Sequence, residues 1–532
     1  MIDLAQLGIR RLVLAIHDAS FPSDRDEDLG RGSSATRGAA RLFRYARKLG
    51  FTGIQLGPQG QTSRANASPY DGTIFSRHTG NIGLDAFAQL VPPSVLARAV
   101  VETAGGPAQH ARAFDATQML IEAAFPNRDR AALAAFREAN AAWLERDAAA
   151  ATTPVDVYAF GQLLAHQEHA RVRELAARDH LALYGDLHVG YAPSDAAAYA
   201  DAFLRDYVIG APPSRTNPEG QPWGYPVLDP AQYGPAQYSG RARELLVARV
   251  DKMFAEYDSM RIDHPHGLVC PWVYRAGDPD PVRAVQHGAR LFDSPDLPDH
   301  AALAQYAIAR PDQLDRSLPR YADGWVRELD DDQISRYGVL VDAILASAIR
   351  AGRDPRDLSF EVLSTMPYPL GAVLERHGFG RWRVLQKANL ADPADVYRSE
   401  NARPADWVML GNHDTSPIFA VIAGWTAVQR ERWARHLAQR LHLRETARLA
   451  GDGFLATAML AELFASRAEN VSIFFADLFG ETERFNVPGV VDAANWSLRL
   501  PADFERLHAE RLAEGRALDL PLAAQLARSA RS

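Results

Sequence analysis

Cysteine is almost absent from this sequence. Its 532 residues include one cysteine, Cys270, so no disulfide can form within the chain. Because structural disulfides belong to oxidising compartments, this scarcity fits a reducing one, and we expect a cytoplasmic protein. The N-terminal stretch also lacks a basic region followed by a long apolar run, so we expect no signal peptide.

Long apolar runs and an excess of positive charge are absent as well. No window approaches the roughly 18 uninterrupted apolar residues of a membrane-spanning helix, so we expect no membrane span. The formal net charge is −8, from 58 Lys and Arg against 66 Asp and Glu. Since nucleic-acid-binding surfaces are basic, we expect no nucleic-acid partner. Neither feature excludes a neutral ligand such as a sugar.

Short apolar runs, several of them ending in polar residues, recur along the chain. Eight of them read as strands, at 11–18, 51–58, 181–187, 259–264, 357–363, 381–387, 406–414 and 470–477. Near-continuous apolar runs suit strands that are covered on both faces. Segments with helical spacing lie between them, such as 36–50 and 338–352, which both end at a glycine. The alternation predicts an α/β fold, a (β/α)8 TIM barrel.

The spacing of the runs is uneven, which predicts insertions in one catalytic barrel over residues 1–532. Segment 85–180 is too long for one crossover and is rich in Ala, Arg and Glu, so we expect an inserted helical subdomain. Segment 192–240 is rich in Pro, Gly, Tyr and Ser. Long irregular segments in compact proteins are often functional loops, so we expect a substrate-loop insertion there. We expect no separate C-terminal β domain.

Carboxylates follow or end five of the eight runs. In barrels of this kind, catalytic groups lie at the C-terminal ends of the strands. The strand ends therefore predict an acidic mouth made by Asp186, Asp263, Glu361, Asp414 and Asp477.

The stretch SMRIDHPHG, residues 259–267, allows two interpretations. His264 and His266 could be half of a metal site, but such a site would want histidines at other strand ends, where the sequence has Glu361 and Gln386. A sugar site wants two or three carboxylates instead, one to attack the anomeric carbon and one to protonate the leaving oxygen. We favour the sugar site and expect no metal; a metal-dependent hydrolase stays the alternative.

Six segments between residues 68 and 501 carry a more specific pattern. They are SPYDGTIFSRHTGNIGLD (68–85), YGDLHVGYAPSDAAAYA (184–200), GAPPSRTNPEGQPWGYP (210–226), RIDHPHG (261–267), NHD (412–414) and ERFNVPGVVDAANWSLRLP (483–501). In this order they resemble the motifs of the 4-α-glucanotransferases (amylomaltases, or disproportionating enzymes), relatives of the α-amylases. The resemblance implies a retaining transglycosylase that passes α-1,4-glucan segments from a maltooligosaccharide donor to a sugar acceptor.

The resemblance also implies the catalytic roles. Asp263 would be the nucleophile, Glu361 the general acid and base, and Asp414 the group that stabilises the transition state. Arg261 lies two residues before Asp263, so both side chains face the same side of a strand. Its guanidinium would keep Asp263 ionised and aimed. We expect burial near other carboxylates to raise the pKa of Glu361.

Substrate contacts and cofactors follow from the same resemblance. His413 would bind the glucose ring by hydrogen bonds, and Asp186, Tyr70 and Trp223 are further candidates for sugar contact. No metal or organic cofactor is implied. For each of these residues the alternative is a packing or capping role.

Several residues depart from the family pattern near the expected site. Val362, Leu363 and Ser364 follow Glu361 where the family has Asp-Leu-Gly, and Thr415 follows Asp414 where the family has asparagine. A different donor or acceptor, a hydrolase of the same mechanism, and a weakened enzyme kept for glucan binding all remain open.

Other residues are expected to be structural. We expect Asp477, His266 and Cys270 to pack, and Trp496 and Arg499 to close the barrel bottom or a helix interface.

Overall fold

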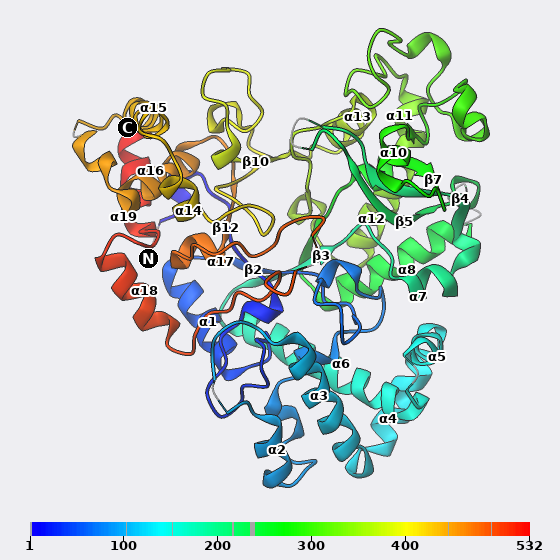
Figure 1. Ribbon diagram of the computed structural model, residues 1–532, viewed down its shortest axis with the longest axis vertical. Coiled ribbons are helices and arrows are strands. Elements are labelled where there is room, and N and C mark those ends of the chain that lie inside the picture. Colours follow the sequence, from blue (N-terminus) through cyan, green and yellow to red (C-terminus); the bar gives the residue numbers. More distant parts are fainter. Residues whose placement is uncertain are drawn as a thin grey trace. The chain divides into compact units, whose positions relative to one another are not determined.

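The structure is a computed structural model that describes residues 3–102, 104–151, 153–214, 217–234, 240–444, 446–490 and 492–531. The chain divides into two compact units. Unit 1 comprises Met1–Gly72, Ser76–Asp186 and Trp382–Ser532, and unit 2 comprises Thr73–Phe75 and Leu187–Arg381. Figure 1 shows the helices and strands of both units.

Unit 1 contains parallel strands in the order β10-β11-β12-β1-β2-β3. Every neighbouring pair is parallel, and the register places Arg11 opposite Asn470 and Val13 opposite Gly53. The strands are almost wholly buried, which is why their sequences are near-continuous apolar runs. Their bounds are β1 (Arg11–Ile16), β2 (Gly53–Leu56), β3 (Ala182–Leu187, whose last residue begins unit 2), β10 (Trp382–Val384), β11 (Trp407–Met409) and β12 (Asn470–Phe474).

Helix α1 shows how the sequence sets the helices of unit 1. The Thr36 hydroxyl accepts a hydrogen bond from the Ala39 amide at its start, and the helix ends at Gly50, whose φ of 103° favours glycine. Tyr45 of α1 packs edge-on against Phe504, so α1 and α18 lie side by side (Figure 1). The helices are α1 (Arg37–Leu49), α2 (Pro93–Ala99), α3 (His110–Ala124), α4 (Arg130–Ala139), α5 (Ala141–Ala150), α6 (Val155–Arg178), α14 (Ile418–Ala423), α15 (Ala427–Arg440), α16 (Asp452–Ala465), α17 (Phe475–Phe479), α18 (Phe504–Ala513) and α19 (Leu520–Arg531).

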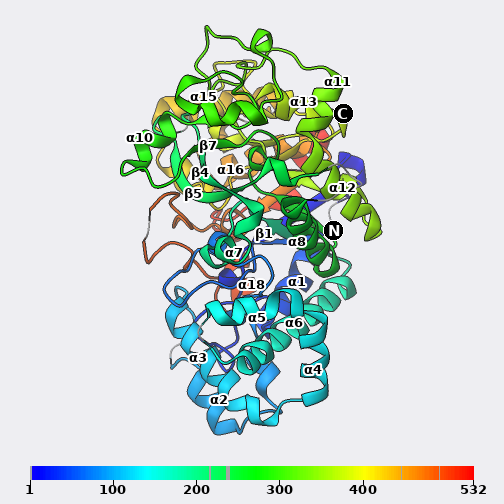
Figure 2. The same ribbon diagram turned by 90° about the vertical axis from the view of Figure 1, so that its right-hand side faces the viewer.

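The helices between residues 93 and 178 form one group within unit 1. Helix α6 contacts α3, α4 and α5, and α2 contacts α3. Figure 2 shows these helices gathered together. Segment 85–180 therefore consists mainly of helices that pack on one another.

Unit 2 contains two separate strand pairings. Strands β6 (Ser259–Ile262) and β9 (Ser359–Phe360) are parallel neighbours, with Arg261 opposite Ser359. A second sheet is antiparallel in the order β5-β4-β7-β8. Its strands are β4 (Phe203–Ala211), β5 (Gln221–Leu228), β7 (Trp272–Arg275) and β8 (Ala289–Arg290). The helices of unit 2 are α7 (Pro193–Ala198), α8 (Arg241–Glu256), α9 (His266–Val269), α10 (Pro281–Gln286), α11 (Asp331–Tyr337), α12 (Val339–Arg350) and α13 (Tyr368–Arg376).

All eight predicted strands are present. The eight apolar runs contain β1, β2, β3, β6, β9, β10, β11 and β12 in turn. The antiparallel sheet was not predicted, and two of its strands, β4 and β5, lie in the segment 192–240 that we expected to be irregular. Within the described residues, no helix has both the length and the apolar character to cross a membrane.

Candidate active site

The ends of β6 and β9 bring two carboxylates of unit 2 onto one guanidinium. An amino group of Arg261 lies 2.8 Å from Asp263 Oδ1 and 2.6 Å from Glu361 Oε2. The pairing of β6 with β9 places the Glu361 backbone beside β6, because the Glu361 amide donates to the Ile262 carbonyl at 2.9 Å. Arg261 is buried, with 4 % of its side chain exposed, whereas Asp263 keeps 17 %. Asp263 is thus a charged group that solvent, and a ligand, can reach.

Three rings pack in a column beside Asp263, those of Trp223, His264 and His266. His264 has a φ of 43°, an unusual backbone conformation for a residue other than glycine. Its ring stacks on His266 at a centroid distance of 4.5 Å and meets Trp223 edge-on at 4.6 Å. Trp223 belongs to β5, so the predicted substrate segment lies against the turn that follows Asp263.

The two histidines of this column are neutral at neutral pH. Burial lowers the pKa of His264 well below its usual value, and burial together with the Arg290 charge lowers the pKa of His266 to about 4. His266 Nε2 lies 3.1 Å from the Thr365 carbonyl, so this nitrogen carries the proton and donates. His266 therefore interacts with the loop that follows Glu361.

A grouping with the spacing of metal ligands occurs elsewhere in the described residues. It consists of Glu400, His436 and Glu462 and includes neither His264 nor His266. An Arg398 amino group donates to Glu400 at 2.7 Å, and Arg440 Nε lies 3.8 Å from Glu462. These cations balance the charges of the two carboxylates.

Unit 1 assembles the remaining candidates around Tyr70. The Tyr70 hydroxyl donates to Asp186 Oδ2 at 3.0 Å, and its ring stacks on His413 at 5.2 Å. His413 Nε2 lies 3.5 Å from Asp414 Oδ2. The structure therefore brings Tyr70, Asp186, His413 and Asp414 together within unit 1, whereas Arg261, Asp263, Glu361 and Trp223 belong to unit 2.

The segment near residue 485 holds Asp414 in place. Asn486 Nδ2 donates to Asp414 Oδ1 at 2.6 Å, and an Arg484 amino group donates to the Asp414 carbonyl at 2.8 Å. Asp414 keeps 38 % of its side chain exposed. Both residues lie in the quoted C-terminal motif, but their role in positioning Asp414 was not predicted.

Two further aromatic residues of this group were missed or misplaced. His17, which follows β1, lies 5.1 Å from His413 and 5.6 Å from Trp496 between ring centroids. The ring lies so close to Gly57 that a Cβ there would lie 2.1 Å from it. Trp496 also lies 5.7 Å from Tyr70, so our expectation that it packs at the barrel bottom or a helix interface is wrong. His17 could have been found by reading the end of the first strand as the other strand ends were read.

Arg499, Asp477 and Cys270, which we expected to be structural, are all buried. Arg499 makes a buried bidentate ion pair with Asp28 at 2.8 and 2.7 Å. Asp477 is buried, accepts a hydrogen bond from the Ile418 amide at 2.7 Å, and has a pKa that burial raises to about 7. Cys270 is buried, which raises the pKa of its thiol to about 12 and makes it unreactive.

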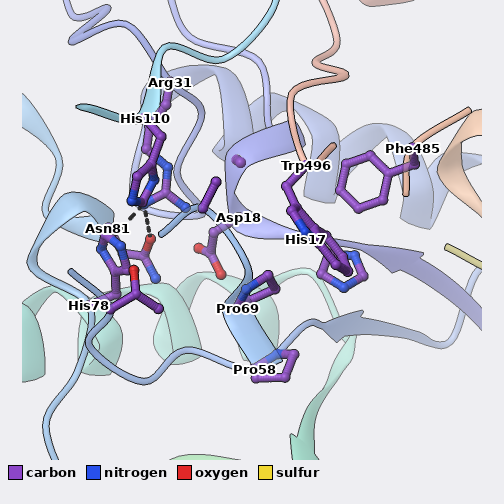
Figure 3. Close-up of a pocket in the computed structure, with 13 residues that line it drawn as sticks. His17, Asp18, Arg31, Pro58, Pro69, His78, Asn81, His110, Phe485 and Trp496 are labelled. Carbon is purple, nitrogen blue, oxygen red and sulfur yellow. Dashed lines mark hydrogen bonds between the residues drawn. The ribbon is translucent and has the colours of Figure 1, made fainter. Parts of the chain in front are cut away.

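A pocket with both polar and apolar lining adjoins the aromatic group of unit 1 (Figure 3). Arg31 donates to Asn81 at 3.1 Å and to His78 Nδ1 at 3.3 Å on one side, and His17 and Trp496 lie on the other. Burial lowers the pKa of His78 well below its usual value and that of His110 to about 4. The pocket encloses about 370 Å³, counting its open mouth.

Comparison with known proteins identifies the kind of protein that carries these residues. The family model of the 4-alpha-glucanotransferases (glycoside hydrolase 77) matches residues 147–504. Because the match covers more than half of the chain, the chain belongs to this family of glycoside hydrolases.

Individual relatives are distant. A chloroplastic/amyloplastic 4-alpha-glucanotransferase of Arabidopsis thaliana is 22 % identical over 368 residues, which are 67 % of this chain and 52 % of the relative. A 4-alpha-glucanotransferase of Chlamydia pneumoniae is 23 % identical over 368 residues, 66 % of this chain and 57 % of the relative. The chain spans little more than half the length of these curated relatives.

Solved structures show the fold. An amylomaltase of Streptococcus agalactiae in complex with acarbose has a TM-score of 0.70 at 16 % identity, covering 96 % of this chain and all of that one. An amylomaltase of Corynebacterium glutamicum has a TM-score of 0.69 at 18 % identity, covering 97 % of this chain and 77 % of that one. The predicted (β/α)8 barrel fold is thereby confirmed.

Proposed function

We propose that this protein transfers α-1,4-glucan segments between maltooligosaccharides by a double displacement. The observation that carries the proposal is the pair of carboxylates, Asp263 and Glu361, held by one buried guanidinium at the ends of β6 and β9. Two carboxylates on one side of a strand pair are the groups that retaining glycoside chemistry requires. Membership of the 4-alpha-glucanotransferase family supports the choice of transfer.

The first displacement forms a bond to Asp263. Its carboxylate oxygen attacks the anomeric carbon while Glu361 gives its proton to the departing 4-oxygen, so the shortened glucan leaves as an alcohol. In the second displacement, Glu361 takes the proton from an acceptor 4-hydroxyl, and that oxygen displaces Asp263 from the anomeric carbon. The glucan is lengthened, and both carboxyl groups return to their initial states.

Arg261 favours the ionised form of Asp263 but disfavours the protonated form of Glu361. A guanidinium beside a carboxylate favours its ionised form, which suits Asp263. Glu361 must carry a proton in the first displacement, so its 2.6 Å contact with Arg261 has to lengthen when a sugar is bound. We propose that the bound substrate separates the two and that burial then favours the protonated glutamic acid.

The remaining candidate residues would bind the sugar. Asp414, aimed by Asn486, would accept hydrogen bonds from glucose hydroxyls that strengthen as the ring flattens. His413 and Asp186 would bind further hydroxyls, and Tyr70 and Trp223 would present ring faces to the sugar's apolar face. The donor and acceptor would be maltooligosaccharides, and this chemistry uses no metal or organic cofactor. We also propose a cytoplasmic location, on the ground of the single cysteine.

Incubation of the protein with pure maltotriose tests the proposal. Transfer predicts glucose together with maltopentaose and longer chains in the product chromatogram. Glucose and maltose alone would mean hydrolysis by the same residues. An unchanged maltotriose peak, with maltotriose binding by calorimetry, would overturn the proposal in favour of a glucan-binding protein.

A further inference from the structure

The loop that carries Glu361 has little secondary structure of its own. Strand β9 has only two residues, and no helix or strand follows until α13 begins at Tyr368. Its backbone is tied by side chains instead: Arg381 donates to the Leu363 carbonyl, and Asp323 accepts from the Met366 amide at 2.9 Å. The direction of the Glu361 carboxyl group therefore depends on contacts made by other segments of unit 2.

His266 supplies another of these contacts, from the nucleophile side. It is the first residue of α9, three positions after Asp263, and its Nε2–H donates to the Thr365 carbonyl at 3.1 Å. Burial lowers its pKa to about 4, so the ring is a neutral donor at neutral pH. In the described part of the chain, its buried Nδ1 has no hydrogen-bond partner, which agrees with an unprotonated nitrogen there.

The His266 ring is also fixed in direction. It stacks on His264 at 4.5 Å with an angle of 27° between the rings, and His264 in turn meets Trp223. The column thus connects the substrate strand β5, the turn after Asp263 and the loop after Glu361. Since a buried ring held on its face can move little, its donor stays aimed at one carbonyl.

We propose that His266 is a positioning residue that holds the Glu361 loop at the distance from Asp263 that general acid catalysis needs. The inference rests on the proposed function and goes beyond it, because His266 touches no reacting atom. A displacement of about 1 Å can cost about 100-fold in rate, so one hydrogen bond that sets the loop is enough to matter.

Two substrates, maltotriose and α-maltotriosyl fluoride, distinguish a displaced general acid from other causes of lost activity. Maltotriose leaves as an alcohol and needs the proton from Glu361. In α-maltotriosyl fluoride, the C–F bond breaks as Asp263 forms its bond to the anomeric carbon, and fluoride departs as an anion without a proton. The burst of fluoride release therefore reports the first displacement without the need for a general acid.

Two substitutions divide the properties of His266. His266→Phe keeps a ring in the column but removes the donor, and we expect kcat on maltotriose to fall about 10- to 100-fold. The fluoride burst should stay within about 3-fold of wild type, because it needs no acid. His266→Gln keeps an N–H near the position of Nε2 and should restore maltotriose activity to within about 5-fold of wild type.

His287 offers a matched control in the same unit. Its ring Nδ1 donates to the Arg283 carbonyl at 2.9 Å at the exposed end of α10. His287→Phe also removes a hydrogen bond from a histidine to a backbone carbonyl. It should leave the rates on maltotriose and on α-maltotriosyl fluoride unchanged.

The outcomes are distinct. An equal loss on both donors in His266→Phe, whether from unfolding or from a displaced Asp263, would overturn the positioning role, and so would full activity on maltotriose. A wild-type protein that releases no fluoride and gives no transfer products would instead overturn the proposed function.

Discussion

The carboxylates of the two units have different partners. In unit 2, Asp263 and Glu361 share the charged guanidinium of Arg261. In unit 1, Asp186 receives the Tyr70 hydroxyl and Asp414 receives the Asn486 amide. A cation stabilises a full negative charge, which a nucleophile needs, whereas neutral donors orient a carboxylate without neutralising it. The difference supports the proposal that Asp263 and Glu361 make and break the glycosidic bond and that Asp414 binds sugar hydroxyls.

Asp477 shows what happens to a carboxylate with neither role. It is fully buried, accepts backbone hydrogen bonds, and its pKa rises to about 7 because burial disfavours the charge. Burial alone therefore keeps a carboxyl group of this protein partly protonated near neutral pH. Asp263 and Glu361, by contrast, contact the buried guanidinium of Arg261.

The largest effect is expected at Asp263. Asp263→Asn keeps the shape but removes the attacking charge, so the initial rate of maltotriose disproportionation should fall by about 10⁴-fold or more. Asp258, paired with Arg353 at 3.2 Å just before β6, gives a control, and Asp258→Asn should stay within about 2-fold. An Asp263→Asn variant that keeps more than a few per cent of the rate would show that Asp263 is not the nucleophile.

Glu361→Gln should cost less, because only proton transfer is lost. We expect about 10²- to 10⁴-fold on maltotriose. With α-maltotriosyl fluoride, added azide should speed turnover and give a glycosyl azide, since azide attacks without a general base. If azide has no effect on the variant, Glu361 is not the base, and the acid–base assignment within unit 2 is wrong.

Asn486 tests the sugar-binding side. Asn486→Ala removes a 2.6 Å hydrogen bond to Asp414, and we expect kcat/KM on maltotriose to fall about 10- to 100-fold. The fluoride burst should fall as well, because maltotriose and α-maltotriosyl fluoride react through transition states with the same flattened sugar ring. Asn401, whose amide donates to backbone carbonyls at an exposed site, is the control: Asn401→Ala should change neither rate.

The smallest expected effect concerns stability and pH. The pKa of Asp477 is raised in the folded state, so its contribution is fully present below its unfolded value near 4 and is lost as the pH rises through about 7. The free energy of unfolding should therefore drop over this range, by about 1.4 kcal/mol for each unit of the shift. Urea unfolding of wild type and Asp477→Asn at pH 5 and pH 8 measures this, and identical pH dependence in both would show that Asp477 is not the titrating group.

The sequence predicted the barrel well because its buried strands lie in short, mostly apolar runs separated by segments with helical spacing. It did not predict β4 and β5, because Pro and Gly weaken strand patterns, as in QPWGYPVL, and here pairing with β7 decides the structure. Strand ends and the family motifs predicted Asp263, Glu361 and Asp414 as the catalytic residues, and their roles stay predictions.

The support around these carboxylates could not be read in the same way. His266, expected to pack, does pack, but its donor bond to a loop 99 residues away depends on tertiary structure. Trp496 reads as an ordinary core tryptophan, and only the fold shows that it lies beside Tyr70.

Covalent trapping tests the central claim most directly. The protein would be incubated with a slow fluorosugar donor, digested, and its peptides mapped by mass spectrometry. We predict a gain of one fluoroglycosyl mass on the peptide that contains Asp263, and no label in Asp263→Asn. An unlabelled protein that still converts maltotriose, or a label on any other carboxylate, would contradict the assignment of Asp263 as the nucleophile.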